Sequence, residues 1–259
     1  MRIVKTNFDK IQDMMVENIV SNKITVESFW EEHVIESNHY ALMKEDKMVG
    51  YFTIHDESTI TSFYIIEEYS HLGQEIFEII KRYEKVTNAM VTTGDEYFLA
   101  HCVDSFQRME KQAYFSLFGE NVPTDFIRKN IQFERVRSTD EASIIKLAGD
   151  FFSEDEVNRV INNVDYYRVY KVLQDEELIG FGIVETGRVI KSIASVGMFV
   201  MEDKRQQGYA KNILRQLKEL VEKEGYEARS GCWYYNHNSL KSMKSAGAYP
   251  KSRLLRFYF

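Results

Sequence analysis

The chain has 259 residues, 44% hydrophobic and 14% aromatic, so it can bury a core, and general disorder is excluded. Its net charge of −7 argues against nucleic acid or an anionic membrane as the main partner. The start lacks an apolar signal segment, no run approaches a membrane span, and only Cys102 and Cys232 occur, so we expect a cytoplasmic protein. The six histidines show no ligand spacing, so we expect no metal.

The first half of the chain predicts a mixture of helices and strands. Residues 1–37 are expected to be mostly helical, because Ile11, Met14, Met15 and Ile19 form one apolar face. The pattern then predicts a hairpin over 40–54, a strand over 59–66 and a helix over 72–83. A short strand over 89–93, a short helix over 105–112 and a strand over 113–118 complete this half.

The stretch from Gly119 to Asp125 predicts a linker, because it places Pro123 among turn-forming residues. We therefore expect a domain over 1–118, a linker over 119–131 and a domain over 132–259.

The second half begins with a strand over 133–137, and Ser138 is placed to cap a helix. A hairpin over 167–184 and a buried strand ending at Val200 follow. The next helix has apolar residues at one-face spacing and stops near Gly225.

The two halves repeat each other. Gly50 corresponds to Gly180, Gly73 to Gly208 and Ser105 to Ser239, at offsets of 130, 135 and 134 residues. Agreement at three places in order predicts two tandem copies of one α+β fold.

The turn after Val200 has the pattern Arg-x-x-Gly-x-Ala, formed by Arg205, Gly208 and Ala210. A glycine and a small residue at a helix start let a ligand approach the unpaired backbone N–H groups, and the helix dipole and the arginine favour an anion. This pattern is typical of a pyrophosphate site.

In this context the chain resembles the GNAT superfamily of acetyl-CoA-dependent N-acetyltransferases over roughly residues 132–259. Val200, Arg205, Gly208 and Ala210 fit the family's first motif, with Glu202 in place of the frequent proline. A second motif is matched by Asn236, Ser239 and Gly247, with Met243 in place of the usual tyrosine. The resemblance implies two tandem domains, each a mixed, mostly antiparallel sheet flanked by helices.

The resemblance also implies the residues that hold acetyl-CoA, the co-substrate. The backbone of Met198, Phe199 and Val200 would pair with the pantetheine arm, and the Phe199 N–H would hold the thioester carbonyl and its oxyanion. The pyrophosphate would meet Arg205 and the N–H groups of Gln206, Gln207, Gly208, Tyr209, Ala210 and Lys211. Asn236 and Ser239 would contact the pantetheine or cap the next helix, and for Asn238 and Ser239 a plain helix cap is the other interpretation.

The usual catalytic acid and base are absent from their family positions. Ala194 replaces the frequent glutamate, and Met243 replaces the tyrosine. Glu185 is a candidate base and Tyr234 a candidate proton donor, with Tyr235 and Tyr249 as other donors and a structural role open for each.

The first copy differs where the phosphates would bind, because Ser70 and Glu75 replace Arg205 and Ala210. A carboxylate about 4 Å from a phosphate costs roughly 4 kcal/mol at an effective dielectric near 20, more than a helix dipole supplies. We therefore expect no coenzyme A in this copy.

The function implied is transfer of an acetyl group to a primary amine by direct attack in a ternary complex. The acceptor would be a small molecule or a peptide, and the sequence is compatible with a homodimer. Two alternatives stay open: a non-catalytic acyl-CoA sensor or scaffold, and an acyl or aminoacyl transferase with another donor.

Overall fold

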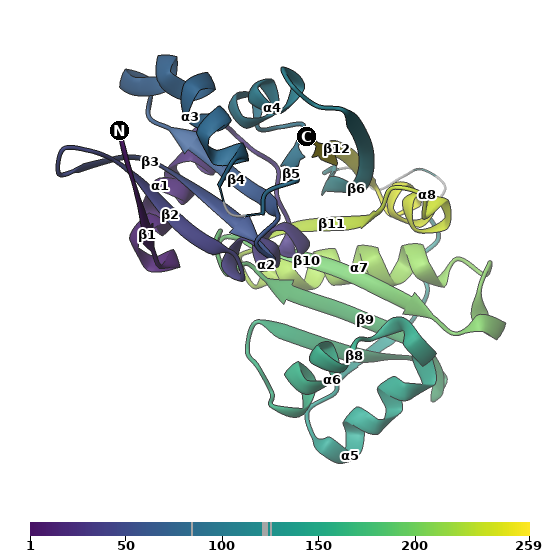
Figure 1. Cartoon of the computed structure of the whole chain (residues 1–259). Helices are drawn as coiled ribbons and strands as arrows, with labels where there is room; N and C mark the ends of the chain where they lie inside the picture. The colour runs from purple at the N-terminus through teal and green to yellow at the C-terminus, as the bar shows by residue number, and fades with distance from the viewer. Residues whose placement is uncertain (84, 121–123, 125) are drawn as a thin grey trace. The chain divides into compact units, whose positions relative to one another are not determined.

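The computed structural model describes residues 1–83, 85–120, 124 and 126–259 (Figure 1). The chain forms two compact units. The N-terminal unit comprises Met1–Phe115 together with Lys251–Phe259, and the C-terminal unit comprises Ser116–Pro250. Pro123, on which the expected linker was based, lies outside the described residues.

The N-terminal unit alternates strands and helices along the chain. Its elements are β1 (Arg2–Thr6), α1 (Phe8–Ser21), α2 (Ser28–Ile35), β2 (Asn38–Lys44), β3 (Lys47–His55), β4 (Thr59–Ile65), η1 (Glu67–Leu72), α3 (Gly73–Lys81), β5 (Asn88–Thr92), α4 (Glu96–Val103) and most of β6 (Arg108–Phe118).

The strands of this unit run in the order β1-β2-β3-β4-β5-β12-β6. The strands β1 to β4 pair antiparallel, whereas β4 and β5 are parallel. The apolar residues of α3 and α4, among them Phe77 and Phe98, pack on the sheet in one core. The helices α1 and α2 contribute the buried residues Met15 and Trp30.

The last strand, β12 (Ala248–Tyr258), starts in the C-terminal unit and ends in the N-terminal one. Its second part pairs antiparallel with β5, with Leu254 opposite Thr92 and Tyr258 opposite Asn88. The expected division assigned this whole strand to the second domain. In the structure, nine residues from the end of the chain complete the sheet of the first unit.

The C-terminal unit has the same kinds of element in the same order. They are β7 (Gln132–Arg135), α5 (Thr139–Ala142), η2 (Ser143–Phe151), α6 (Glu154–Ile161), β8 (Tyr167–Gln174), β9 (Glu177–Thr186), β10 (Ile193–Val200), η3 (Glu202–Lys204), α7 (Tyr209–Lys223), β11 (Glu227–Trp233), α8 (His237–Ser245) and the start of β12.

These strands run in the order β11-β10-β9-β8-β7, and only β10 and β11 are parallel (Figure 1). One sheet face packs on α7 through residues such as Val196, Ile213 and Leu217. The other face packs on α5, η2 and α6 through Phe152, Val160 and Phe181. Helix α7 forms as expected, because its apolar residues recur at the spacing of one face.

Each unit is thus a mixed, mostly antiparallel sheet flanked by helices, and the predicted fold class is confirmed. The two hairpin glycines are equivalent, because Gly50 lies opposite Ile65 and Gly180 opposite Val200. A Cβ on Gly50 would lie 2.4 Å from the Tyr64 carbonyl oxygen, and one on Gly180 2.1 Å from that of Phe199. Both positions therefore exclude a side chain.

Two local predictions were wrong. The helix expected over 105–112 is instead Glu96–Val103, and Arg108–Phe118 is one long strand. The helix begins earlier because Asp95 caps it, accepting a hydrogen bond from the Phe98 N–H at 3.1 Å. The counterpart of α8 is therefore α4, so the predicted match of Ser105 to Ser239 does not hold. The expectation that residues 1–37 are mostly helical is confirmed by α1 and α2, which the short strand β1 precedes.

Candidate functional site

The parallel strands β10 and β11 of the C-terminal unit separate after three residue pairs. Their register runs from Ile193 opposite Glu227 to Ser195 opposite Arg229. The next carbonyl on β10, that of Val196, accepts a hydrogen bond from the Ser230 hydroxyl at 2.8 Å. A side chain thus ends the ladder, and the rest of β10 has a backbone edge that β11 does not cover.

The hydrogen-bond alternation of β9 and β10 shows which groups face this gap. The Gly187 N–H donates to Ile193 O, and the Met201 N–H donates to Ile179 O, each at 2.9 Å. In an antiparallel pair, hydrogen-bonded and non-hydrogen-bonded residue pairs alternate along the strands. The odd-numbered residues of β10 therefore form the backbone hydrogen bonds with β9. The N–H and C=O groups of Met198 and Val200 therefore face the gap.

This alternation corrects the role expected for the Phe199 backbone. Phe199 lies opposite Phe181 at a hydrogen-bonded position, so its N–H is directed at β9. It cannot also hold a ligand in the gap. Because backbone groups alternate in direction along a strand, the N–H groups that face the gap are those of Met198 and Val200.

The turn after β10 leads into a helix without a side-chain cap. Gly208 occupies the N-cap position of α7 with φ +80°, and Gln206 has φ +62°. By contrast, α6 and α8 are capped by Ser153 and Asn236. The backbone N–H groups of residues 206–210 donate no hydrogen bond within the described part of the chain. They are available to an anion, which the helix dipole favours.

Three basic side chains surround this turn. Arg205 donates from Nε to the Val200 carbonyl at 3.3 Å, and its guanidinium lies 5.9 Å from the Phe199 ring centroid. The position that a Cβ atom would occupy on Gly208 lies 3.5 Å from Lys211 Cε and 4.0 Å from Lys129 Cε. Lys129 was not expected at this site, because it lies about 80 residues earlier in the segment assigned to the linker.

The Phe199 side chain lies on the sheet face opposite α7. Its ring centroid is 4.9 Å from that of Phe151 and 6.3 Å from that of Phe181. Phe151 is 44% exposed, so these rings form an apolar surface that solvent reaches.

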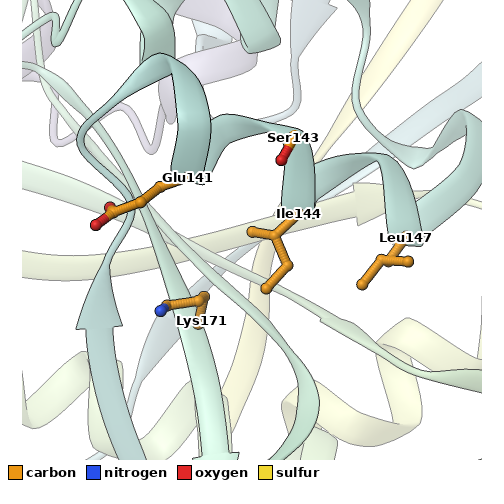
Figure 2. A pocket seen from close by; sticks show the side chains of 5 residues that line it. All are labelled: Glu141, Ser143, Ile144, Leu147 and Lys171. Carbon is orange, nitrogen blue, oxygen red and sulfur yellow. The ribbon is translucent and has the colours of Figure 1, made fainter.

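A hollow of about 440 Å³ lies on the same face of the sheet. Figure 2 shows its lining, four side chains from α5 and η2 and one from β8: Glu141, Ser143, Ile144, Leu147 and Lys171. Lys171 lies opposite Phe181, which lies opposite Phe199, so the hollow and the aromatic group share one level of the sheet. Lys171 is paired with Glu134 at 2.7 Å.

The candidate base, Glu185, lies away from the free edge of β10. It is opposite Ser195, four residues before Phe199, which is about 13 Å along a strand. Its Oε1 is 3.9 Å from both Arg159 Nη1 and Arg188 Nη2.

Tyr234 and the second motif lie beyond the end of β11. The Tyr234 ring is half-buried and lies 5.2 Å from the Tyr235 ring. The Asn236 Oδ1 accepts a hydrogen bond from the Ser239 N–H at 3.1 Å, so Asn236 rather than Asn238 caps α8. Met243 is 2% exposed and packs in the core, and its thioether has no proton to donate.

The corresponding place in the N-terminal unit is filled by its own side chains. There β4 and β5 pair at only two positions before they separate. A Cβ on Gly73 would lie 2.2 Å from Tyr97 Oη and 2.4 Å from His101 Nε2. The Phe63 ring, on β4, lies 5.6 Å from that of Tyr97 and 5.4 Å from that of His101.

The burial of β4 and β5 agrees with the packing of Tyr97 and His101 at Gly73. All residues of β5 are buried, and all of β4 except Tyr64, whereas β10 and β11 are partly exposed over 197–199 and 231–233. Burial also raises the pKa of Tyr97 to about 12, which keeps its hydroxyl protonated. The N-terminal gap is thus closed where the C-terminal gap is open.

Two units in tandem, each with mixed strands and a parallel pair that separates beside a helix, define a duplicated α+β protein. Models of two related families match the chain: "Acetyltransferase (GNAT) domain" over residues 7–118 and "Acetyltransferase (GNAT) family" over residues 136–248. The chain belongs to the GNAT family of acetyltransferases, with two domains in tandem, and is therefore an acyltransferase.

Solved structures show the same fold over the whole chain. A GNAT-family acetyltransferase from Colwellia psychrerythraea is 17% identical and aligns over 100% of both chains with a TM-score of 0.87. A GCN5-related N-acetyltransferase from Sphaerobacter thermophilus is 10% identical over 99% of this chain and 94% of that one, with a TM-score of 0.65.

A tandem GNAT protein from the clavulanic acid biosynthesis pathway is 11% identical over 99% of this chain and 97% of that one, with a TM-score of 0.61. No curated protein matches the chain. Among the described residues, no helix combines the length and the apolar character needed to cross a membrane.

Proposed function

We propose that the C-terminal unit transfers the acetyl group of acetyl-CoA to a primary amine on a small molecule or peptide. The observation that carries this proposal is the free edge of β10 at Met198 and Val200, which leads directly to the uncapped start of α7. A thioester carrier needs both features, one for its amide-containing arm and one for its phosphates.

The residues present fit this co-substrate. The pyrophosphate meets the N–H groups of residues 206–210, with Arg205 and Lys211 as nearby cations. The pantetheine arm adds to the edge of β10 as a short strand would. Asn236 keeps the start of α8 in place at the far side of the gap.

The acceptor approaches from the face that carries Phe199 and Phe151. This face offers an apolar wall and, farther across the sheet, the hollow lined by Lys171. A desolvated wall favours the neutral amine, whose unperturbed pKa is about 10.4, over its ammonium form.

In the reaction the amine nitrogen attacks the thioester carbonyl, a C–N bond forms and the C–S bond breaks. The oxyanion is held by the N–H of Met198 or Val200, since that of Phe199 is directed at β9. Tyr234 gives its proton to the departing thiolate. The amine's proton leaves through water, and Glu185 accepts it only at the end of such a chain because of its distance along the sheet.

A thiol-release assay with acetyl-CoA and a library of amines tests this function. Gly208→Glu places a strained residue and a carboxylate at the phosphate position, and we expect it to abolish turnover. Gly225→Glu is the matched control, because Gly225 has φ +93° at the other end of α7 with open space around it. Turnover that survives in Gly208→Glu would show that the phosphates bind elsewhere.

A second candidate function is an acyl-CoA sensor without catalysis. It is favoured by the ion pairs that hold Glu185 and by the burial of Met243. Calorimetric heat from coenzyme A without thiol release from any amine in the library would select it over the transferase.

A further inference from the structure

The segment 126–131, N-terminal to β7, is fixed on α7 by a buried asparagine. Asn212 is completely buried. Its Oδ1 accepts a hydrogen bond from the Lys129 N–H at 2.7 Å, and its Nδ2 donates to Ile127 O at 3.0 Å and to Gly208 O at 3.2 Å. One side chain thus joins this segment to the glycine that begins the helix.

Other contacts fix the same segment. Gln216 Nε2 donates to Lys129 O at 3.0 Å, so both backbone groups of Lys129 are bonded to α7. Arg128 forms two hydrogen bonds with Glu219, at 3.1 and 2.8 Å, and Ile131 is 7% exposed in the core. The segment is therefore held on α7 at Lys129 itself and at the residues before it.

This anchoring directs the Lys129 side chain to the start of α7. Its Nζ lies 4.4 Å from the centroid of the Tyr209 ring, and its Cε lies 4.0 Å from a Cβ built on Gly208. Lys211 approaches Gly208 from the helix itself, with Cε at 3.5 Å from that Cβ. Within the described residues Lys129 has no ion pair with a carboxylate. Its charge therefore remains available to an anion that lies over Gly208.

We propose that Lys129 is a phosphate-binding residue of the coenzyme site, supplied by the segment 126–131 rather than by the strand-turn-helix motif. This inference rests on the proposed function, which places a pyrophosphate at the same turn. When phosphate oxygens occupy that turn, the ammonium group leaves the Tyr209 ring and makes a charge-assisted hydrogen bond to them. The segment is then part of the binding site as well as a connection along the chain.

Calorimetric titration of coenzyme A into the full-length protein tests the role of Lys129. We expect Lys129→Gln to weaken binding about tenfold, the loss of one charge-assisted hydrogen bond in a partly exposed site. Lys223→Gln removes the same charge at the exposed far end of α7, away from the segment 126–131, and we expect a change of less than about twofold. Lys129→Arg keeps the charge and should keep most of the affinity.

Dephospho-coenzyme A, which lacks the 3′-phosphate, identifies the phosphate. An equal loss with both ligands assigns Lys129 to the pyrophosphate, and a loss confined to coenzyme A assigns it to the 3′-phosphate. Each variant must first keep the wild-type thermal unfolding midpoint. If Lys129→Gln does not, Lys129→Met replaces it, because methionine keeps much of the side-chain length without the charge.

Two results would overturn the inference while leaving the proposed function standing. One is wild-type affinity in Lys129→Gln, and the other is an equal loss in Lys223→Gln, which would show a general charge effect. An absence of heat with the wild-type protein would instead refute the proposed function itself.

Discussion

The contribution of Asp95 to the free energy of unfolding should depend on pH. The residue caps α4 in the N-terminal unit through its hydrogen bond to the Phe98 N–H, and it is 8% exposed. Burial raises the pKa of this carboxyl from 3.8 to about 7, and the hydrogen bond from Phe98 offsets only part of that effect. No cation forms an ion pair with it among the described residues.

The sign follows from which state holds the proton. Between pH about 4 and about 7 the folded chain keeps a proton on Asp95 that the unfolded chain releases, so stability falls as the pH rises through this range. An elevation of the pKa from 3.8 to about 7 corresponds to an upper limit of about 4 kcal/mol. Asp95→Asn keeps an oxygen for the cap and does not titrate, so it should recover most of this free energy at pH about 8.

Urea unfolding followed by tryptophan fluorescence measures the effect. Trp30 is buried in the N-terminal unit and Trp233 is exposed, so a Trp233→Phe background isolates the signal of the unit that contains Asp95. The free energy of unfolding of Asp95→Asn should equal that of its parent at pH about 4 and exceed it by several kcal/mol at pH about 8. The exposed neighbour Glu96 gives the control, since Glu96→Gln should change stability by less than about 0.5 kcal/mol at either pH. Equal stability of Asp95→Asn and its parent at high pH would refute the reasoning.

Three further predictions concern the last strand, the proton donor and the number of sites. Leu254→Ala, at a fully buried position of β12, should destabilise the N-terminal unit by about 2–5 kcal/mol in the same fluorescence assay, and a loss below about 1 kcal/mol would contradict the pairing of β12 with β5. Tyr234→Phe should lower kcat by about a hundredfold or more while leaving the dissociation constant of coenzyme A unchanged, and a kcat near wild type would remove Tyr234 from the mechanism. Calorimetry should give one coenzyme A per chain, because Tyr97 and His101 fill the N-terminal site, whereas a stoichiometry of two would show that these side chains move aside.

Most of the fold could be predicted because hydrophobic periodicity and glycine positions are local signals. The hairpins around Gly50 and Gly180 repeat a pattern that the sequence carries in full. Helix α4 was missed although Asp95 is a good cap residue, because its short apolar run does not differ by period from a buried strand. The pairing of β12 with β5 joins residues 162 to 170 positions apart, and no local pattern specifies such a partner.

In the candidate site, too, local features could be predicted from the sequence, whereas features that depend on distant residues could not. The turn around Gly208 could be predicted because a short motif encodes it. The direction of the Phe199 N–H could not, because it depends on the register of β9 against β10, and a shift of one residue reverses every group. Lys129 was missed because its place beside Gly208 depends on Asn212, a buried residue far along the chain.

A crystal structure of the full chain with bound coenzyme A tests the central claim most directly. We predict a pyrophosphate within hydrogen-bond distance of the N–H groups of residues 206–210, and a pantetheine arm bonded to the backbone of Met198 and Val200. Electron density for the ligand at Gly73 in the N-terminal unit, or none at Gly208 in crystals soaked to saturation, would contradict the account.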